Sequence, residues 1–289
     1  MKASGNAYAK INLSLDIISK MDDGYHEMLM VMQSLSLSDD VVIECDPGEG
    51  CSISSDVGYV PDDDRNTAAQ AAAAFFSKTG ISGYKTRIQL KKRIPVCAGL
   101  GGGSADAACV LRMLNTMFSA GLSLGELREI GSSIGSDVPF CVSGGTALAK
   151  GRGEILIDLQ PIPQCSIILC KPQFSISTPE LFACVRPDRI AARPDTDGVL
   201  EALRTGDLPG IAHRVYNVFE DILPRGGRDV ADIKDSLLDS GALGTAMTGT
   251  GPTVFGIFTD AAQAQAAHAK LRGSYPECYL CTTTRRNNF

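Results

Sequence analysis

The sequence predicts a two-domain α+β protein, and three observations support this fold class. The chain has 289 residues, which suits two domains better than one. Apolar residues recur with the period of a strand in some segments and of a helix in others, and both patterns occur in both halves. Pro161-Ile162-Pro163 separates these halves. We therefore expect one domain over residues 1–160 and a second over residues 161–289.

Composition and charge argue against several classes of protein. Apolar residues make up 44% of the chain and charged residues 21%, which is typical of folded domains with packed cores. The net charge is −6 and the longest basic run is Lys91-Lys92-Arg93, so no nucleic-acid partner is expected. No apolar run approaches the roughly 18 residues of a membrane span, and residues 1–15 do not resemble a signal peptide. These features predict a cytoplasmic protein without a membrane partner.

The ten cysteines are scattered along the chain, and several lie inside apolar runs. In a cytoplasmic protein such residues are expected to be reduced thiols. One C-x-x-C pair, Cys278 and Cys281, has no second pair, and the chain has only three histidines. Because a zinc site needs more ligands than this, no metal site built from these side chains is expected.

The first predicted element is a strand at residues 7–17. Its odd positions are apolar, and its even positions are mostly polar. This period of two indicates a strand with one buried and one polar face. Lys10 and Asn12 lie on the polar face.

The next elements alternate between strand and helix. A strand is expected at about residues 40–45, and an alanine-rich helix follows from Asn66, a candidate N-cap, to about Gly80. Residues 86–90 alternate again and predict a strand.

A glycine-rich segment, Gly99-Leu100-Gly101-Gly102-Gly103-Ser104, then leads into a helix, for which Ser104 is the expected N-cap. The apolar positions that mark this helix are Ala107, Val110, Leu111, Leu114 and Phe118. A further helix is expected at residues 124–134, followed by a turn at Gly144-Gly145 and a strand pair that ends near residue 159.

The second half contains a buried strand at residues 166–170 and is then mostly helical up to residue 240. Residues 247–258 are predicted to form a strand, a glycine turn and a second strand. A helix at residues 261–271 and a strand at residues 278–283 follow. No internal repeat interrupts this order.

The glycine-rich segment has the features of a phosphate site. Glycines let the backbone approach an anion closely, and the free N–H groups at a helix start point toward it. The segment has no Gly-Lys pair of a P-loop, and Ser104 occupies the place of the third glycine of a dinucleotide-binding loop. H-R-D and D-F-G, the signatures of protein kinases, are missing from the sequence. An ordinary glycine bend before a helix is the alternative interpretation.

Residues 95–108 resemble the second motif of the GHMP kinases, P-x-x-x-G-L-G-S-S-A-A. Residues 7–13 resemble the A-x-A-K-x-N-L opening of one branch of that family, and Gly24-Tyr25-His26 resembles its D-G-Y-H motif. Residues 247–255 resemble the third GHMP motif, with threonines where serines are common. The matches extend from residue 7 to residue 255 in the family's order.

This resemblance implies the GHMP fold, with a ribosomal-S5-like N-terminal domain that binds ATP and a ferredoxin-like C-terminal domain that binds the substrate. It also implies an ATP-dependent small-molecule kinase of a branch that phosphorylates a cytidine-bearing isoprenoid precursor. ATP and Mg²⁺ are the implied cofactors. Ser104 is the one side chain expected to reach the Mg²⁺, which nucleotide oxygens would mainly hold. The expected assembly is a monomer or a weak homodimer.

Residues matching the family's ATP site form the phosphate loop, together with one asparagine near the adenine. The implied ATP-binding residues are Asn66, Pro95, Val96, Cys97, Ala98, Gly99, Leu100, Gly101, Gly102, Gly103, Ser104 and Ala105. Ala105 replaces a second serine of many members, which leaves Ser104 as the hydroxyl donor.

The same resemblance implies two catalytic residues. Asp137 lies in a run similar to the family's G-x-D-V-P-F and is the expected acceptor of the substrate's hydroxyl proton. Lys10 is its expected partner. The alternatives are an aspartate that caps a helix and a solvated lysine on a strand.

The expected substrate-binding residues lie in both halves. Tyr25 and His26 are expected at the cytidine base, where aromatic stacking contributes about 1–3 kcal/mol. Phe182 resembles a second stacking ring, although a core phenylalanine is an alternative. Asn12 shares the polar face of the first strand, and Thr178 is a weaker polar candidate.

Several other functions fit parts of the sequence. Another GHMP kinase acting on homoserine, mevalonate or a sugar would keep the fold, as would a diphosphomevalonate decarboxylase. A nucleotide-binding regulator without catalysis would be expected to lack Lys10 or Asp137, and both are present.

Overall fold

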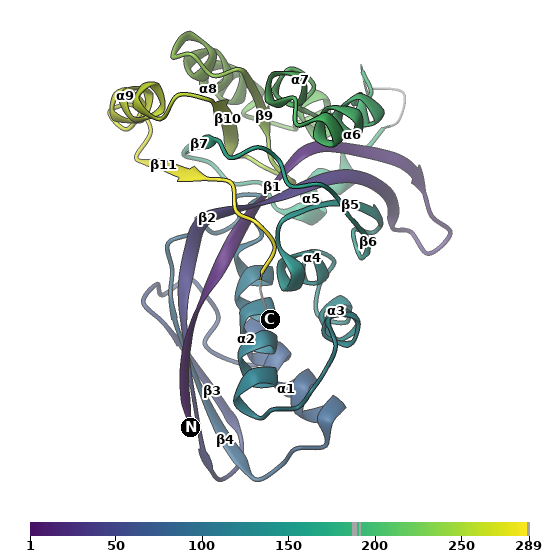
Figure 1. Cartoon of the computed structure of the whole chain (residues 1–289), viewed down its shortest axis with the longest axis vertical. Helices are drawn as coiled ribbons and strands as arrows, with labels where there is room; N and C mark the ends of the chain where they lie inside the picture. Colours follow the sequence, from purple (N-terminus) through teal and green to yellow (C-terminus); the bar gives the residue numbers. More distant parts are fainter. Residues whose placement is uncertain (187–189, 191, 288–289) are drawn as a thin grey trace.

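The computed structural model describes residues 1–186, 190 and 192–287, and its helices pack against two β-sheets (Figure 1). The larger sheet has seven described strands in the order β3-β4-β2-β1-β8, and β5 pairs with β2 and with β6. Its strands are β1 (Lys2–Lys20), β2 (His26–Pro47), β3 (Cys51–Ser55), β4 (Tyr84–Lys91), β5 (Thr146–Gly151), β6 (Ile155–Asp158) and β8 (Tyr216–Asn217). β1 and β2 are much longer than the sequence indicated, and Figure 1 shows them running between the two ends of the molecule.

Helices from the first half pack together beside this sheet. They are α1 (Thr67–Thr79), α2 (Gly102–Met117), α3 (Leu124–Ser132) and α4 (Val138–Ser143). The side chain of Asn66 accepts a hydrogen bond from the N–H of Ala68, and Gly80 ends α1 in a left-handed conformation. Both ends of α1 are therefore where the cap residues predicted them.

The smaller sheet has the described strand order β11-β7-β10-β9, and each neighbouring pair is antiparallel. Its strands are β7 (Ser166–Lys171), β9 (Gly244–Met247), β10 (Val254–Phe258) and β11 (Glu277–Thr282). The helical elements of this half are α5 (Thr178–Ala183), α6 (Thr196–Thr205), α7 (Leu208–Ala212), the 3₁₀ helix η2 (Val218–Ile222), α8 (Gly227–Asp239) and α9 (Ala261–Leu271). The mixed fold is the predicted α+β class, and the division at residues 160 and 161 stays a prediction.

Two segments of the second half return to the larger sheet. β8 pairs in parallel with β1, and the residues after β11 bond to β2 and to the end of α4. The N–H of Thr284 donates to the carbonyl of Ser34, and the N–H of Asn287 donates to that of Ser143. The two halves are thus joined by backbone pairing as well as by packed side chains.

The polar face predicted for β1 is present, but it is buried, whereas only the apolar face was expected to be buried. Lys10, Asn12, Ser14 and Asp16 are all buried, although they occupy the polar positions of the strand. The phosphate loop and the second half of the chain cover this face, as the hydrogen bonds of Lys10 with Leu100 and of Asn12 with Thr248 show. Buried polar side chains need partners, and the candidate active site supplies those of Lys10 and Asn12.

The expected N-cap of α2 is also wrong. The helix begins at Gly102, after Gly101 in a left-handed conformation, so Ser104 lies inside the first turn rather than before it. The glycines allow the chain to turn into the helix three residues earlier than an N-cap at Ser104 predicts.

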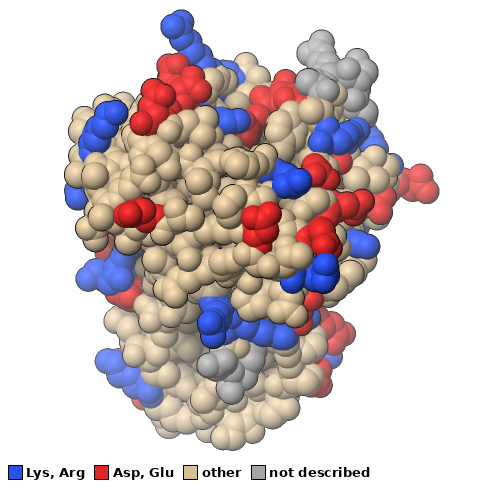
Figure 2. Space-filling model, turned by 45° about the horizontal axis from the view of Figure 1, so that its top comes forward, with Lys and Arg blue, Asp and Glu red and all other residues tan. Residues whose placement is uncertain are grey.

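Basic and acidic side chains are interspersed on the face of the molecule seen in Figure 2. Among the described residues, no helix is long and apolar enough to cross a membrane.

Candidate active site

An ion pair with a buried lysine joins β1 to the start of α4. Nζ of Lys10 lies 3.2 Å from Oδ2 of Asp137 and 2.8 Å from Oδ1 of Asn12. The lysine side chain is 4% exposed, whereas that of the aspartate is 27% exposed and lines a cavity. A desolvated ammonium therefore faces a carboxylate that a bound molecule can still reach.

Asp137 occupies the N-cap position of α4 but makes no capping hydrogen bond with its side chain. Pro139, in the first turn of the helix, lacks an N–H group for such a bond. The carboxylate is thus free to face Lys10. The far end of α4 is held by Arg112 and Asn287, whose side chains donate to the carbonyl of Cys141.

The phosphate loop, residues 95–104, packs against β1 and α1. The N–H of Lys10 donates to the carbonyl of Leu100 at 3.0 Å, and Oγ1 of Thr67 donates to that of Gly103 at 2.8 Å. Cys97 has φ of 52°, a left-handed conformation that costs a side-chain-bearing residue free energy. The second half of the loop is therefore fixed to β1 and α1, and the strained Cys97 precedes it.

The phosphate loop also contacts the turn between β9 and β10. A Cβ atom on Gly99 would lie 2.1 Å from the carbonyl oxygen of Thr248, so only glycine fits there. The Thr248 hydroxyl donates to the carbonyl of Gly99 at 3.3 Å. Asn217, which the sequence gave no reason to select, is fully buried and donates to the carbonyls of Met247 and Gly249. The second and third sequence motifs thus meet backbone to backbone.

A cavity of about 490 Å³, cavity 1, lies over the phosphate loop. All ten loop residues from Pro95 to Ser104 line it, together with Lys10 and Asp137. N–H groups at the start of α2 face this region, and a helix N-terminus favours bound phosphate. Cavity 1 therefore combines an anion cradle with the charge pair.

A second cavity of about 980 Å³, cavity 2, adjoins cavity 1. The residues that line both are Met28, Ser136, Arg152, Thr178, Pro179 and Phe182. Tyr25 and His26 line cavity 2, and the His26 ring stacks on Phe182 with centroids 5.3 Å apart. The Phe182 ring also packs edge-on against Phe219, at 5.1 Å. These aromatic side chains can hold a flat ring of a ligand close to the Lys10–Asp137 pair.

The surroundings of cavity 2 favour a neutral histidine, and a paired guanidinium lies in its lining. Burial, with a smaller contribution from the charge of Lys20, lowers the pKa of His26 below its ordinary value. The guanidinium of Arg152 lies 3.7 Å from the centroid of the Tyr25 ring and pairs with Asp23. Tyr25 itself is exposed, so the part of its ring that Arg152 does not cover can contact a ligand.

Arg152 was missed from the sequence because it lies in the turn between β5 and β6, where a basic residue is ordinary. The sequence also gave no signal for Thr67 or Lys92, which line cavity 1. These three residues come together around cavity 1 only when the chain is folded.

Three predicted site residues are not among the residues that line either cavity. Asn12 is fully buried beneath Lys10, and its side-chain amide contacts Lys10, the hydroxyl of Thr248 and the sulfur of Met30. It therefore supports the lysine rather than facing the cleft. Asn66 is occupied as the cap of α1, with its amide donating to the carbonyl of Pro61, and Ala105 is buried in α2.

The chain is similar to known proteins over nearly its full length. Residues 66–145 match the model of the GHMP kinases N terminal domain, and residues 199–277 match that of the GHMP kinases C terminal domain. The 4-diphosphocytidyl-2-C-methyl-D-erythritol kinase of Clostridium perfringens is 40% identical over 98% of both chains. The protein of the same name from Listeria monocytogenes is 42% identical over 97% of this chain and 95% of its own length.

A crystal structure of a 4-(cytidine 5'-diphospho)-2C-methyl-D-erythritol kinase superimposes with a TM-score of 0.82 and 31% identity, covering 97% of this chain and 99% of the other. The expected fold class is thereby confirmed. The chain belongs to the GHMP kinases and, within them, to the family of 4-diphosphocytidyl-2-C-methyl-D-erythritol kinases.

Proposed function

We propose that this chain transfers the γ-phosphoryl group of ATP to the 2-hydroxyl of 4-diphosphocytidyl-2-C-methyl-D-erythritol. The observation that carries the proposal is the Lys10–Asp137 pair, which lines an anion cradle directly beside an aromatic cavity. The names of the relatives support the choice of substrate.

The donor side of the reaction belongs to cavity 1. We assign the ATP phosphates to the backbone N–H groups of the phosphate loop and of the first turn of α2, because glycines leave this backbone open. Mg²⁺ bound with ATP would neutralise phosphate charge, held chiefly by nucleotide oxygens. The hydroxyl of Ser104 lines cavity 1 and is a hard oxygen ligand of the kind that Mg²⁺ prefers.

The acceptor side depends on the charge pair. The carboxylate of Asp137 accepts the proton of the attacking hydroxyl, or orients that hydroxyl toward the phosphoryl group. The ammonium of Lys10 lies within 3.2 Å of the same carboxylate, so it both fixes the carboxylate and places positive charge where negative charge moves during transfer.

Recognition of the cytidine is assigned to cavity 2. Tyr25, His26 and Phe182 present aromatic surface there, and the open ring of Tyr25 is the stacking surface for the base. Thr178 lies where the two cavities join, and its hydroxyl is 3.1 Å from that of Thr250. Arg152 lines both cavities and supplies a cation that suits the diphosphate of this substrate.

An ADP-release assay tests the function. The wild type and Asp137→Asn are supplied with Mg-ATP and either 4-diphosphocytidyl-2-C-methyl-D-erythritol, homoserine or mevalonate. Turnover of the cytidine compound alone is expected, and the variant should lose about two to four orders of magnitude in kcat.

Each other result has a distinct meaning. Turnover of homoserine or mevalonate instead would show that this chain is another kind of GHMP kinase. It would also refute the assignment of Tyr25, His26 and Phe182 to a cytidine base. ATP binding without turnover of any of the three alcohols would favour a nucleotide-binding regulator. Full activity of Asp137→Asn would refute the assignment of Asp137.

A further inference from the structure

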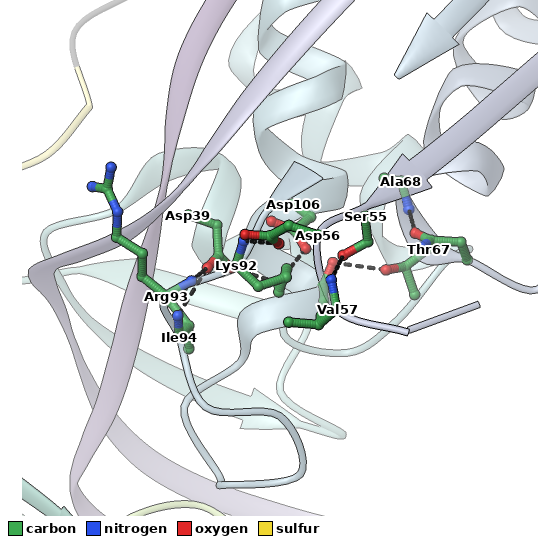
Figure 3. Close-up of polar contacts among 12 residues, drawn as sticks. Asp39, Ser55, Asp56, Val57, Thr67, Ala68, Lys92, Arg93, Ile94 and Asp106 are labelled. Atoms are coloured by element: carbon green, nitrogen blue, oxygen red, sulfur yellow. Dashed lines mark hydrogen bonds and ion pairs between the residues drawn. The ribbon is translucent and has the colours of Figure 1, made fainter. Parts of the chain in front are cut away.

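Besides the Lys10–Asp137 pair, the described residues include a buried charge cluster and a buried pair of thiols. In the charge cluster, Nζ of Lys92 lies 2.5 Å from Oδ2 of Asp39 and 2.5 Å from Oδ2 of Asp106 (Figure 3). Lys92 lines cavity 1, so this cluster belongs to the site already described. The thiol pair lies in the smaller sheet, and the proposed reaction does not use it.

The thiol pair consists of Cys170 on β7 and Cys278 on β11, which are neighbouring antiparallel strands (Figure 1). The two residues are directly opposite each other in the register, and their Sγ atoms are 3.0 Å apart. Opposite residues on antiparallel strands have Cα atoms about 4.5–5.5 Å apart, which is within the range that a disulfide bridges. The two sulfurs can therefore bond with little movement of the backbone.

The other cysteines next to these strands have different partners. Sγ of Cys281, also on β11, donates to the carbonyl of Ile167 at 3.6 Å. Sγ of Cys165, just before β7, donates to a threonine hydroxyl at 4.0 Å. On these two strands, the direct contact of two sulfurs is thus made by Cys170 and Cys278.

The surroundings make the two thiols unequal. Cys170 is fully buried, whereas Cys278 is 5% exposed. A hydrogen bond from the Cys170 thiol lowers the pKa of Cys278, and the positive charge of Arg272 lowers it further, against the effect of burial. The same hydrogen bond, together with burial, raises the pKa of Cys170. Cys278 is therefore the sulfur that forms a thiolate first.

We propose that Cys170 and Cys278 are a modification site, at which a hydroperoxide converts the thiol pair into a reversible disulfide that crosslinks β11 to β7. This inference does not depend on the proposed function. The oxidant is a hydroperoxide because burial of both sulfurs excludes larger oxidants such as glutathione disulfide. Such a small molecule reaches Cys278 from the side of β11, which is the outer strand of the smaller sheet among the described strands.

The reaction has two steps. The Cys278 thiolate attacks one oxygen of the hydroperoxide: an S–O bond forms, the O–O bond breaks, and the second oxygen leaves as an alcohol or water with the proton that the thiol released. The Cys170 sulfur then attacks the sulfenic acid: the S–S bond forms, the S–O bond breaks, and water leaves with the Cys170 proton. The two thiols lose two electrons in all, and the O–O bond takes them up.

The crosslink is expected to stabilise the second half of the chain. Cys170 and Cys278 are 108 positions apart, and a disulfide that closes so long a loop restricts the unfolded chain strongly. β11 also leads into residues 283–287, which bond to β2 and to the end of α4. Oxidation should therefore raise Tm.

The test uses the full folded chain. Exposed thiols are blocked with iodoacetamide, and the protein is treated with hydrogen peroxide, alkylated again after unfolding and analysed by peptide mass spectrometry with fragment ions. A Cys170–Cys278 crosslink is expected, and dithiothreitol should remove it. The crosslinked protein should melt roughly 3–10 °C higher than the reduced protein.

Variants that melt cooperatively separate the roles of the two sulfurs. Cys170→Ser keeps a hydroxyl that can donate to the Cys278 sulfur but cannot form the disulfide, so a Cys278 sulfenic acid should accumulate and be trapped by dimedone on unfolding. Cys278→Ser should leave Cys170 reduced at the same dose of peroxide. Cys281→Ser is the matched control, because Cys281 is buried on the same strand, and it should form the crosslink as the wild type does.

Several results would overturn the inference. If the pair stays reduced in the folded protein at a peroxide dose that oxidises it in the unfolded protein, the fold protects these thiols. A crosslink through Cys165 or Cys281 instead, or a crosslinked protein with an equal or lower Tm, would show that the disulfide does not form between the native strands. Dimedone on Cys170 in Cys278→Ser, but not on Cys278 in Cys170→Ser, would refute the assignment of Cys278 as the attacking sulfur.

Discussion

The charge of Lys10 is the feature whose removal tests the candidate active site most directly. Lys10→Met keeps most of the side-chain volume and removes the ammonium that faces Asp137 and Asn12. Because the lysine side chain is 4% exposed, water cannot replace the lost charge easily. We expect the variant to fold and to lose kcat.

The size of the loss follows from the 3.2 Å separation of Nζ and Oδ2. At that separation two unit charges interact by about 1.3 kcal/mol in water and by about 5 kcal/mol at an effective dielectric constant near 20. The Asp137 side chain is 27% exposed, so the site lies between these limits. An effect of about 2–4 kcal/mol corresponds to a loss of about 30- to 800-fold in kcat.

The assay is steady-state ADP release with Mg-ATP and 4-diphosphocytidyl-2-C-methyl-D-erythritol, with thermal melting as a check on folding. Lys2→Met is the matched control, because Lys2 lies on the same strand and pairs with Glu44, but its side chain is 68% exposed. Such surface pairs contribute at most about 1 kcal/mol to stability, so the control should keep full activity.

One result would refute the reasoning. A folded Lys10→Met enzyme with kcat within about threefold of the wild type would mean that the ammonium does not act on the transferred charge. Lys10 would then be a structural residue that closes the buried face of β1.

Three further predictions concern the phosphate loop and cavity 2. Gly99→Ala should lower Tm much more than Gly121→Ala: both glycines are left-handed, but only at Gly99 would an added Cβ meet a backbone oxygen, at 2.1 Å. Equal melting temperatures of the two variants would contradict this contact. Iodoacetamide should alkylate Cys97 more slowly when ATP is saturating, while the other exposed thiol, Cys51, reacts at an unchanged rate, as followed by peptide mass spectrometry. If ATP protects neither thiol, Cys97 does not contact the nucleotide. His26, with its lowered pKa, should contribute stability that is complete above its unfolded pKa of about 6.5 and is lost as pH falls through its lower folded value. The fall in Tm between pH 7 and pH 5 should therefore be smaller in His26→Gln, and an equal fall would show that this histidine is not the group involved.

Local sequence rules predicted the parts of the site that depend on backbone conformation. Glycines at positions with positive φ, such as Gly99 and Gly101, are recognisable because other residues rarely adopt that conformation. The alternation along β1 also placed Lys10 on the face that carries the polar side chains. Asp137 was assigned through the family motif, since a carboxylate before a short helix alone suggests a cap.

Features that depend on contacts distant in the sequence were not predictable. The strand at residues 7–17 was expected to have only one buried face, yet its polar face is buried as well, and Asn12 bonds to Thr248, 236 residues later in the chain. Arg152 reaches Tyr25 only because β5 pairs with β2. No periodicity within a single segment contains this information, because it arises when separate elements pack together.

The burial of polar residues on β1 explains why the candidate active site lies at the junction of the two halves. Lys10 contacts Asn12 on its own strand, Leu100 in the phosphate loop and Asp137 at α4. Thr248, from the second half, then bonds both to Asn12 and to the phosphate loop. A strand that kept its polar face in water would need none of these contacts, and its lysine would be hydrated and mobile. Packing the second half onto β1 therefore excludes water from the Lys10 ammonium and fixes its position relative to the phosphate cradle. Under these two conditions a single charge can influence phosphoryl transfer strongly.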